Sequence, residues 1–185
     1  MDRDVARILF DAEAIGARVH ALAGRITEIY RDRDLTLVAI LKGSIVFAAD
    51  LIRLIPLRLR LGFVAASSYR GARTTPGPLR IELPDDEPLE GRNVLVVDEI
   101  LDTGRTLAAV VDAVRARGAR DVATCVLVDK RARRAVAIEA DHVGFEIDDA
   151  FVVGYGLDHD GQYRNLPYIG VLGAESLPAR GPDPA

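Results

Sequence analysis

The chain of 185 residues is 49% hydrophobic and 28% charged, with a formal net charge of −4 at pH 7. This balance is typical of a globular protein with one domain and argues against nonspecific nucleic-acid binding. No apolar run is long enough to span a membrane, and the only cysteine, Cys125, excludes an internal disulfide. Its apolar surroundings predict a buried, inert thiol. We therefore expect a cytoplasmic protein that binds neither nucleic acid nor a membrane.

The first third of the chain predicts a helix, a strand and a second helix. Asp11 can cap a helix that runs to about Arg31. The apolar face of this helix has a spacing of three or four residues and consists of Ile15, Val19, Leu22, Ile26 and Ile29. The continuous apolar run 35–41 predicts a strand buried on both faces, and residues 45–55 predict a helix that is apolar almost all round.

The next part of the chain begins at Pro56, which ends that helix. The alternating run 57–63 predicts a half-exposed strand that is antiparallel or at a sheet edge. Segment 67–78, which contains glycine, proline and small polar residues, fits a mobile lid and a long hairpin connection equally well. Residues 79–83 predict the returning strand, and residues 84–90 predict a solvated acidic turn.

The second half of the chain alternates buried strands with one clear helix. Apolar runs at 93–97 and 121–128 predict two further buried strands, and the helix between them is expected to end at Gly118. One face of this helix is apolar and consists of Leu107, Val110, Val111 and Val114. Further strands are expected at 142–147, 150–158 and 168–173.

Strands that alternate with helices predict a mostly parallel sheet with right-handed crossovers. We expect residues 1–174 to form one α/β domain, followed by a disordered tail over 175–185. In such sheets, ligands lie beyond the carboxyl ends of the strands. In this chain, that rule points to 42–44, 98–106 and 129–130.

The sequence VLVVDEILDTGRTL places three carboxylates where a buried strand gives way to a helix. Glycine and threonine at such a turn suit a phosphate, because backbone N–H groups and the hydroxyls of Thr103 and Thr106 can point at the anion. The alternative is that Asp102 or Thr103 only caps the helix. The adjacent acids Asp98 and Glu99 suit a divalent cation or sugar hydroxyls. The sequence contains neither a Walker pattern nor a dinucleotide-binding glycine pattern.

Lysine is rare in this chain: only Lys42 and Lys130 occur among the 24 basic residues. Both follow apolar runs, at positions where ligands are expected. An ammonium is a compact point charge that fits where a planar guanidinium does not. Before any resemblance is considered, ligand binding and the chance survival of two surface lysines are equally consistent with the sequence.

Two acids, a spacer and Asp-Thr-Gly-x-Thr after a buried strand resemble the phosphoribosyl pyrophosphate (PRPP) motif of type I phosphoribosyltransferases. Further similarity narrows the match to the hypoxanthine-guanine phosphoribosyltransferase family of 6-oxopurine salvage enzymes. The matching segments are LKGS at 41–44, SSYRG at 67–71, LVDK at 127–130 and VGFEIDDAFVVGYGLDHDGQYRNLPYIGVL at 143–172. The resemblance implies an α/β, Rossmann-like, mostly parallel sheet flanked by helices, with a small hood from both chain ends and a β-hairpin lid.

The resemblance also implies roles for the residues of the PRPP motif. The 5′-phosphate would bind the turn formed by Asp102, Thr103, Gly104, Arg105 and Thr106. Asp98 and Glu99 would contact the ribose hydroxyls and Mg²⁺, while Asp102 would be the general base or proton carrier near N7 of the purine. The family commonly has Glu before Asp at the paired acids. The reversed order in this chain leaves open which acid contacts the metal and which contacts the ribose.

The resemblance implies that other positions bind pyrophosphate and the purine. Pyrophosphate would contact Lys42, Gly43 and Arg164, the first two in a loop often built with a non-proline cis peptide. The expected purine contacts are Lys130, the ring of Phe151, the backbone of Val152, and Asp158, which is also a candidate ligand of a second metal ion. Without the resemblance, Phe151 would be interpreted as a core residue.

The remaining matches concern the lid and the histidines. Ser68 and Tyr69 match the flexible lid that closes over the reacting centre and excludes water. The three histidines match no catalytic role and are expected on the surface or in loops; they are His20, His142 and His159.

The implied reaction is a Mg²⁺-dependent transfer of the 5-phosphoribosyl group from PRPP to N9 of hypoxanthine or guanine. The products are IMP or GMP and pyrophosphate. One alternative is the same fold with a preference for xanthine or another base, and a second is a non-catalytic regulator that senses PRPP or a nucleotide. The family forms dimers and tetramers, so a homodimer or homotetramer is expected.

Overall fold

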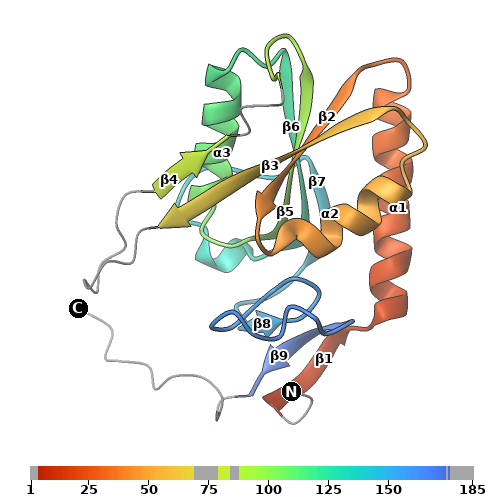
Figure 1. The fold of residues 1–185 in the computed structure, drawn as a ribbon. Coiled ribbons are helices and arrows are strands. Elements are labelled where there is room, and N and C mark those ends of the chain that lie inside the picture. The colour runs from red at the N-terminus through yellow and green to blue at the C-terminus, as the bar shows by residue number, and fades with distance from the viewer. Residues whose placement is uncertain (1–3, 69–78, 84–87, 174, 176–185) are drawn as a thin grey trace.

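The computed structural model describes residues 4–68, 79–83, 88–173 and 175, which form two β-sheets and three α-helices (Figure 1). The elements in chain order are β1 Val5–Phe10, α1 Ala12–Tyr30, β2 Leu35–Leu41, α2 Ser44–Arg53, β3 Leu59–Ser68, β4 Leu79–Glu82, β5 Asn93–Leu101, α3 Arg105–Ala116, β6 Asp121–Asp129, β7 His142–Glu146, β8 Val152–Val153 and β9 Ile169–Leu172. A short 3-10 helix at Arg131–Arg133 follows β6. Within the described part of the chain, every helix is too short or too polar to cross a lipid bilayer.

The larger sheet has six strands in the order β4-β3-β2-β5-β6-β7. All neighbours pair in parallel except β3 and β4, which are antiparallel. The apolar runs of β2 and β5 occupy the middle of this sheet, where both faces are covered. The sequence therefore correctly predicted a mostly parallel α/β sheet in which these runs are buried on both faces.

The two faces of the larger sheet are covered by different helices. Alternate residues such as Leu37 and Leu95 pack with α1 and α2 in one hydrophobic cluster. The residues that follow each of these along the strands, Val38 and Val96, pack with α3 in a second cluster. This alternation follows from the two-residue period of a strand.

The strand expected at 57–63 differs from the observed β3. It starts at Leu59 and lies next to the edge strand β4, with which it pairs antiparallel as expected, but its other neighbour, β2, is parallel. The expected apolar face is also wrong in part, because Leu61 and Phe63 are 37% and 40% exposed. Gly62 and Val64, on the opposite face, are buried. In this strand, alternation of residue type did not show which face lies inward.

Smaller differences concern single residues and short strands. Asp11 caps α1 as expected, with Oδ1 accepting a hydrogen bond from the Ala14 N–H at 2.8 Å, but Ile29 is exposed and Tyr30 is buried in its place. The strand expected over 150–158 is reduced to the two residues of β8. The β1 strand was not expected as a strand at all. The residues from 176 onward and Tyr69 lie outside the described part of the chain.

The smaller sheet has the strand order β1-β9-β8 and is antiparallel throughout. It joins the two ends of the described chain, since Val5 of β1 lies opposite Leu172 of β9. Figure 1 shows this sheet beyond the carboxyl ends of β2 and β5, where a hood is expected. Phe10 at the end of β1 stacks on Phe145 of β7, with ring centroids 3.8 Å apart, so apolar contacts connect the smaller sheet to the larger one.

Candidate active site

The segments singled out in the sequence follow β2, β5 and β6, which are neighbours in the larger sheet. Parallel neighbours end at the same edge of a sheet, so the Lys42–Gly43 loop, the residues around Asp102, and Lys130 are brought close together. The backbone joins two of these segments directly, because the Lys130 N–H donates to the Leu101 carbonyl at 2.9 Å. The smaller sheet lies across the same edge (Figure 1).

A cavity of about 220 Å³ lies at the carboxyl end of β5. Its polar lining consists of Asp98, Glu99, Asp102, Thr103, Gly104 and Thr106. The two acids of β5 and the glycine-threonine turn therefore share one cavity, as their sequence pattern predicts. Of the residues expected at the phosphate, only Arg105 is exposed and does not line this cavity.

The turn before α3 is shaped for an anion. Gly104 has a φ of +82°, forms the N-cap of α3 and provides no side-chain cap. Thr103 Oγ1 accepts a hydrogen bond from the Arg105 N–H at 3.5 Å, so Thr103 contributes to the start of the helix, and both the capping and the anion-binding interpretations of the turn stand. The first amides of the helix have no intrahelical acceptors, and they carry the positive end of the helix dipole. A Cβ atom at Gly104 would lie 2.6 Å from Ile138 Cγ2, so the turn requires glycine for space as well as for its φ angle.

Asp98 and Glu99 both lie within β5, which runs to Leu101 and does not end at Val97. Asp98 Oδ1 accepts a hydrogen bond from the Glu99 N–H at 2.9 Å. Both acids line the cavity.

The paired acids are poorly solvated. Burial, and then the neighbouring charge of Glu99, raise the pKa of Asp98 well above its usual value. Burial also raises the pKa of Glu99, while nearby Arg164 lowers it and Asp158 raises it to smaller extents. Among the described residues, nothing donates a hydrogen bond to the buried Glu99 Oε2. Such carboxylates favour a cation or hydroxyl donors as ligands.

The backbone of Asp102 is held by its neighbours, while Asp102 also lines the cavity. Its carbonyl accepts a hydrogen bond from Arg134 Nε at 3.1 Å. The carboxylate atom Oδ1 is buried without a partner among the described residues, and Oδ2 lies 3.8 Å from Arg133 Nη1. A carboxylate that lines a cavity and has an unused buried oxygen is suited to accept a proton or a hydrogen bond from a ligand.

The loop after β2 contains the expected non-proline cis peptide, between Leu41 and Lys42. Gly43 lies so close to the Glu99 carboxylate that a Cβ atom there would overlap with it. On the other side, a Cβ atom at Gly156 would overlap with the Gly43 carbonyl oxygen. Glu99 and the backbone at Gly156 therefore enclose this loop between them, and Lys42 extends into solvent.

Arg164 and Asp158 form a pair beside this loop. Arg164 Nη2 lies 2.8 Å from Asp158 Oδ1, and Arg164 Nη1 donates to the Gly156 carbonyl at 2.6 Å. The other oxygen of Asp158 accepts from the Gly161 N–H at 2.8 Å. Both Arg164 and Asp158 are therefore engaged with protein groups, although the electrostatic effect of each on Glu99 places them near the paired acids.

The residues expected at the purine lie at the end of β6 and next to β8. Lys130 is only 4% exposed, with Nζ 3.4 Å from Asp149 Oδ1. Phe151 is 39% exposed, so it is not a core residue, and its ring meets His159 edge-on at 5.2 Å. Val152 is buried in β8. A half-exposed ring can stack on a flat molecule, and a buried ammonium can donate a hydrogen bond to an acceptor atom.

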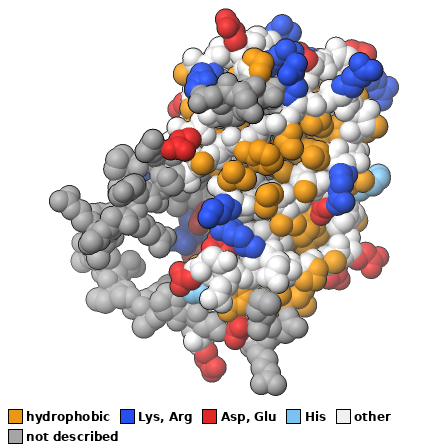
Figure 2. All heavy atoms as spheres, in the orientation of Figure 1, with side chains coloured by type: hydrophobic (Ala, Val, Ile, Leu, Met, Phe, Trp, Pro, Cys, Tyr) orange, Lys and Arg blue, Asp and Glu red, His pale blue; other side chains and the backbone are white. Residues whose placement is uncertain are grey.

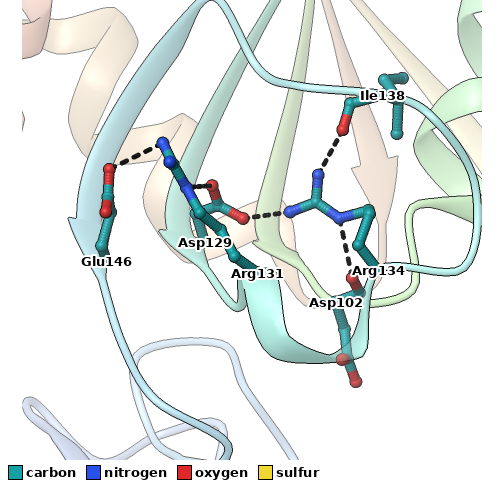
Figure 3. A network of polar contacts seen from close by, with 6 residues as sticks. All are labelled: Asp102, Asp129, Arg131, Arg134, Ile138 and Glu146. Carbon is teal, nitrogen blue, oxygen red and sulfur yellow. Dashed lines mark hydrogen bonds and ion pairs between the residues drawn. The ribbon is translucent and has the colours of Figure 1, made fainter.

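The structure also contains features that sequence reasoning missed. His142 was expected on the surface or in a loop, but it is the first residue of β7 and is 6% exposed. Asp129 and Arg134 form a polar network behind the Asp102–Thr106 turn (Figure 3). The arginine-rich run RARR after β6 is the only sequence signal for this network. Of the expected lid residues, Ser68 ends β3 and Tyr69 lies outside the described residues.

Comparisons with known proteins agree with this geometry. The family model described as "Phosphoribosyl transferase domain" matches residues 6–160. The chain is 41% identical to the hypoxanthine-guanine phosphoribosyltransferase of Bacillus subtilis, over 93% of this chain and 96% of that protein. It is 42% identical to the Staphylococcus epidermidis protein of the same name, over 95% and 98% of the two chains. A crystal structure of a hypoxanthine phosphoribosyltransferase from Staphylococcus aureus superposes with a TM-score of 0.88 at 39% identity, covering 95% of each chain.

Proposed function

The chain belongs to the phosphoribosyl transferase domain family, and we propose that it transfers the 5-phosphoribosyl group from PRPP to N9 of hypoxanthine or guanine. The products are IMP or GMP and pyrophosphate. One observation carries the proposal: the two acids of β5 and the Asp102–Thr106 turn line one cavity. The backbone N–H of the buried Lys130 is hydrogen-bonded to Leu101 at the end of β5. The names of relatives at 41% and 42% identity support the same activity.

The phosphate turn and the paired acids bind the donor in this proposal. The first amides of α3 and the hydroxyls of Thr103 and Thr106 donate hydrogen bonds to the 5′-phosphate. Asp98 and Glu99 accept hydrogen bonds from the ribose hydroxyls, which gives the buried Glu99 Oε2 the partner that the described residues do not supply. Lys42, the amides around Gly43 and the guanidinium of Arg164 contact the pyrophosphate group.

The carboxylate of Asp102 acts on the purine, whereas the backbone of the same turn binds the donor. Its free carboxylate oxygen takes up a proton from the base, which makes the base a better nucleophile at the anomeric carbon. The bond from N9 to that carbon forms, while the bond from the carbon to the pyrophosphate oxygen breaks and its electron pair leaves with pyrophosphate. Lys130 donates to the 6-oxo group, the ring of Phe151 stacks on the purine, and Val152 contacts its edge through the backbone.

Mg²⁺ is part of the proposal, because it neutralises the charge of the pyrophosphate leaving group when it is bound. Asp98 and Glu99 fit this ion, since both are desolvated carboxylates in the donor cavity. Asp158 fits less well, because Arg164 and the Gly161 N–H already occupy its oxygens. Mg²⁺ usually binds one or two carboxylates together with substrate oxygens, so the two acids of β5 would suffice as its protein ligands.

The test is a product assay with purified protein, PRPP, Mg²⁺ and four bases in parallel: hypoxanthine, guanine, xanthine and adenine. We expect IMP and GMP, and we expect activity to disappear with EDTA and return with added Mg²⁺. Product from xanthine alone would support the alternative base preference. If PRPP binds by calorimetry but no base gives a product, the non-catalytic regulator replaces the enzyme.

A homodimer or homotetramer also belongs to the proposal. Figure 2 shows apolar side chains gathered over β3 and α2, and the exposed apolar residues of these elements include Ile45, Leu61 and Phe63. A second copy of the chain would cover this face, because exposed clusters of large apolar side chains mark interaction surfaces. Light scattering after gel filtration should give a multiple of 20.0 kDa for the wild type. The Phe63→Glu variant should have a lower mass than the wild type in the same measurement.

The reaction is proposed to take place in the cytoplasm. PRPP carries several negative charges, and charged molecules do not cross a lipid bilayer unaided. An enzyme that uses PRPP must therefore work in the compartment where PRPP is made. Fractionation of cells that express the chain, with the activity assayed in each fraction, tests this part of the proposal.

A further inference from the structure

The segment that follows β6 packs against the back of the phosphate turn (Figure 3). Arg134 Nε donates to the Asp102 carbonyl at 3.1 Å, and the Ala135 N–H donates to the Thr103 carbonyl at 2.9 Å. The contact is close, because a Cβ atom at Gly104 would lie 3.0 Å from Arg134 Cδ. Two successive carbonyls of the turn are thus held from the side of this segment.

Holding these two carbonyls also orients the amides that follow them. In a trans peptide the C=O and N–H groups point in opposite directions, and both peptide units here are trans. A carbonyl of Asp102 that points back to Arg134 therefore turns the Thr103 N–H toward the cavity. The Thr103 carbonyl, held by Ala135, does the same for the Gly104 N–H. Successive amides aimed at one point form an anion-binding site.

The Arg134 guanidinium is itself fixed in place. Besides the Asp102 carbonyl, it donates to the Ile138 carbonyl and to Asp129 Oδ1, so it has acceptors in three directions. The side chains of Arg134 and Asp129 are only 16% and 4% exposed. A planar fork with several donors can satisfy three separate acceptors at once, and a lysine ammonium at the end of a flexible stem cannot reproduce that geometry.

Asp129 extends the network toward the purine side of the site. Its second oxygen lies 3.3 Å from Arg131 Nε, and Arg131 Nη2 lies 2.9 Å from Glu146 of β7. Asp129 also immediately precedes Lys130, the proposed contact to the 6-oxo group. The network therefore runs without interruption from the end of β7, past the residue beside the purine, to the backbone of the phosphate turn.

We propose that Arg134 is a positioning residue for the reaction: it aims the amides of the Asp102–Gly104 turn at the donor phosphate, and Asp129 sets the orientation of its guanidinium. Arg134 does not contact substrate. Its effect reaches the reaction through the Asp102 backbone, so it acts on phosphate binding and on the direction of the Asp102 carboxylate together. The inference rests on the proposed function, because it concerns the same cavity.

Steady-state kinetics with Arg134→Gln, Arg134→Lys and Asp129→Asn test this role. We expect the KM for PRPP to rise by about tenfold or more in Arg134→Gln, since a hydrogen bond from a charged group is lost, and kcat to fall with it. The KM for the purine should change far less. Arg134→Lys should not restore the wild-type values, because charge alone does not hold the turn. The matched control is Arg115→Gln on exposed α3, which should leave all parameters unchanged.

A merely structural role gives a different pattern. It would lower the folded fraction, measured by circular dichroism, but leave kcat and both KM values of the folded enzyme at wild-type levels; that result overturns the inference. Failure of both Arg134 variants to fold would overturn it as well. The double variant Arg134→Gln/Asp129→Asn should be no worse than the more damaged single variant, and a multiplicative loss would disprove the coupling. An inactive wild type would instead refute the proposed function itself.

Discussion

Two loops at the same edge of the sheet are built to meet one substrate, and they are held in place by opposite means. The turn after β5 is supported from behind by donors, from Arg134 and from the Ala135 N–H, that bind its carbonyls. The loop after β2 is confined by lack of space, because Gly43 lies against Glu99 and its carbonyl lies against Gly156. The first loop is sensitive to the loss of hydrogen bonds, whereas the second is sensitive to added atoms.

The largest effect is expected at the reactive group of the first loop. Asp102→Asn keeps the side-chain volume but removes the group that takes up the proton, so kcat should fall by roughly 10²–10⁴-fold while the KM for PRPP stays within a small factor. Steady-state kinetics with varied PRPP measure both values. Asp112→Asn, exposed on α3, is the control. Equal losses in kcat and PRPP affinity would show that Asp102 serves binding and not chemistry.

The second loop should respond most strongly to Gly156→Ala. The new Cβ atom would overlap with the Gly43 carbonyl oxygen, a backbone atom, at a φ of +98°. We expect kcat/KM to fall by about 10²-fold, as when reacting groups are displaced by about 1 Å. The control is Gly91→Ala, which has a φ of +68° but open space around it, so it carries the backbone strain without the overlap. If both variants lose a similar amount of activity, backbone strain and not steric overlap explains the loss, and the second loop is not held by lack of space.

A substitution outside both loops, at Phe151, should weaken binding of the purine base only. Phe151→Ala removes the half-exposed ring proposed to stack on the purine, and loss of such stacking is worth about 1–3 kcal/mol per base. The KM for hypoxanthine should therefore rise by about tenfold or more, while the KM for PRPP stays unchanged. Phe151→Tyr should keep both values near wild type. An increase in the PRPP KM would mean that the base site and the two loops are not independent.

The smallest expected effect concerns His142, which lies outside the site, and it is an effect on the pH dependence of stability and not on activity. Burial, and then the charge of Arg25, lower the pKa of His142, while Asp141 opposes the shift. A lowered histidine pKa contributes stability that is fully present above the unfolded value of about 6.5, and this contribution is lost as the pH falls from that value through the lower pKa of the folded state. The melting temperature of the wild type should therefore fall more between pH 7.5 and 5.5 than that of His142→Gln.

The control for His142 is His20→Gln on the exposed face of α1, which should keep the pH dependence of the wild type. Neither histidine variant should change kcat/KM at pH 7.5. If His142→Gln melts with the same pH dependence as the wild type, burial of this side chain has no influence on stability in that range.

The sequence predicted the parallel sheet, its buried strands and the phosphate turn, because these depend on local patterns. The apolar run that ends at Val97 did not show that β5 continues, since Ile100 and Leu101 owe their strand conformation to pairing with β6. The prediction that Leu61 and Phe63 lie inward failed for a related reason. Their alternation is a local pattern, but no helix in the described part of the chain covers them, so both side chains are exposed. Pairing and coverage are set by other parts of the chain.

The candidate site was predictable as far as its residues carry a motif. The paired acids, the Thr-Gly turn and the two lysines were identified from the sequence, and the structure places the acids and the turn in one cavity. Arg134 was not identified, because its acceptors include two backbone carbonyls, which have no signature in the sequence. The burial of His142 was equally hidden, since it depends on α1 and β6 packing around the start of β7.

The pairing of β1 with β9 has a practical consequence for protein engineering. The Gly173 N–H donates to the Asp4 carbonyl at 2.7 Å, so the two ends of the described chain meet within one hydrogen bond. A short glycine-serine linker can join these residues directly, and new ends can be opened in the exposed turn at 31–33, between α1 and β2. Such a circular permutant keeps every strand pairing and separates the chain ends from the catalytic edge, where a fused reporter would obstruct substrate entry.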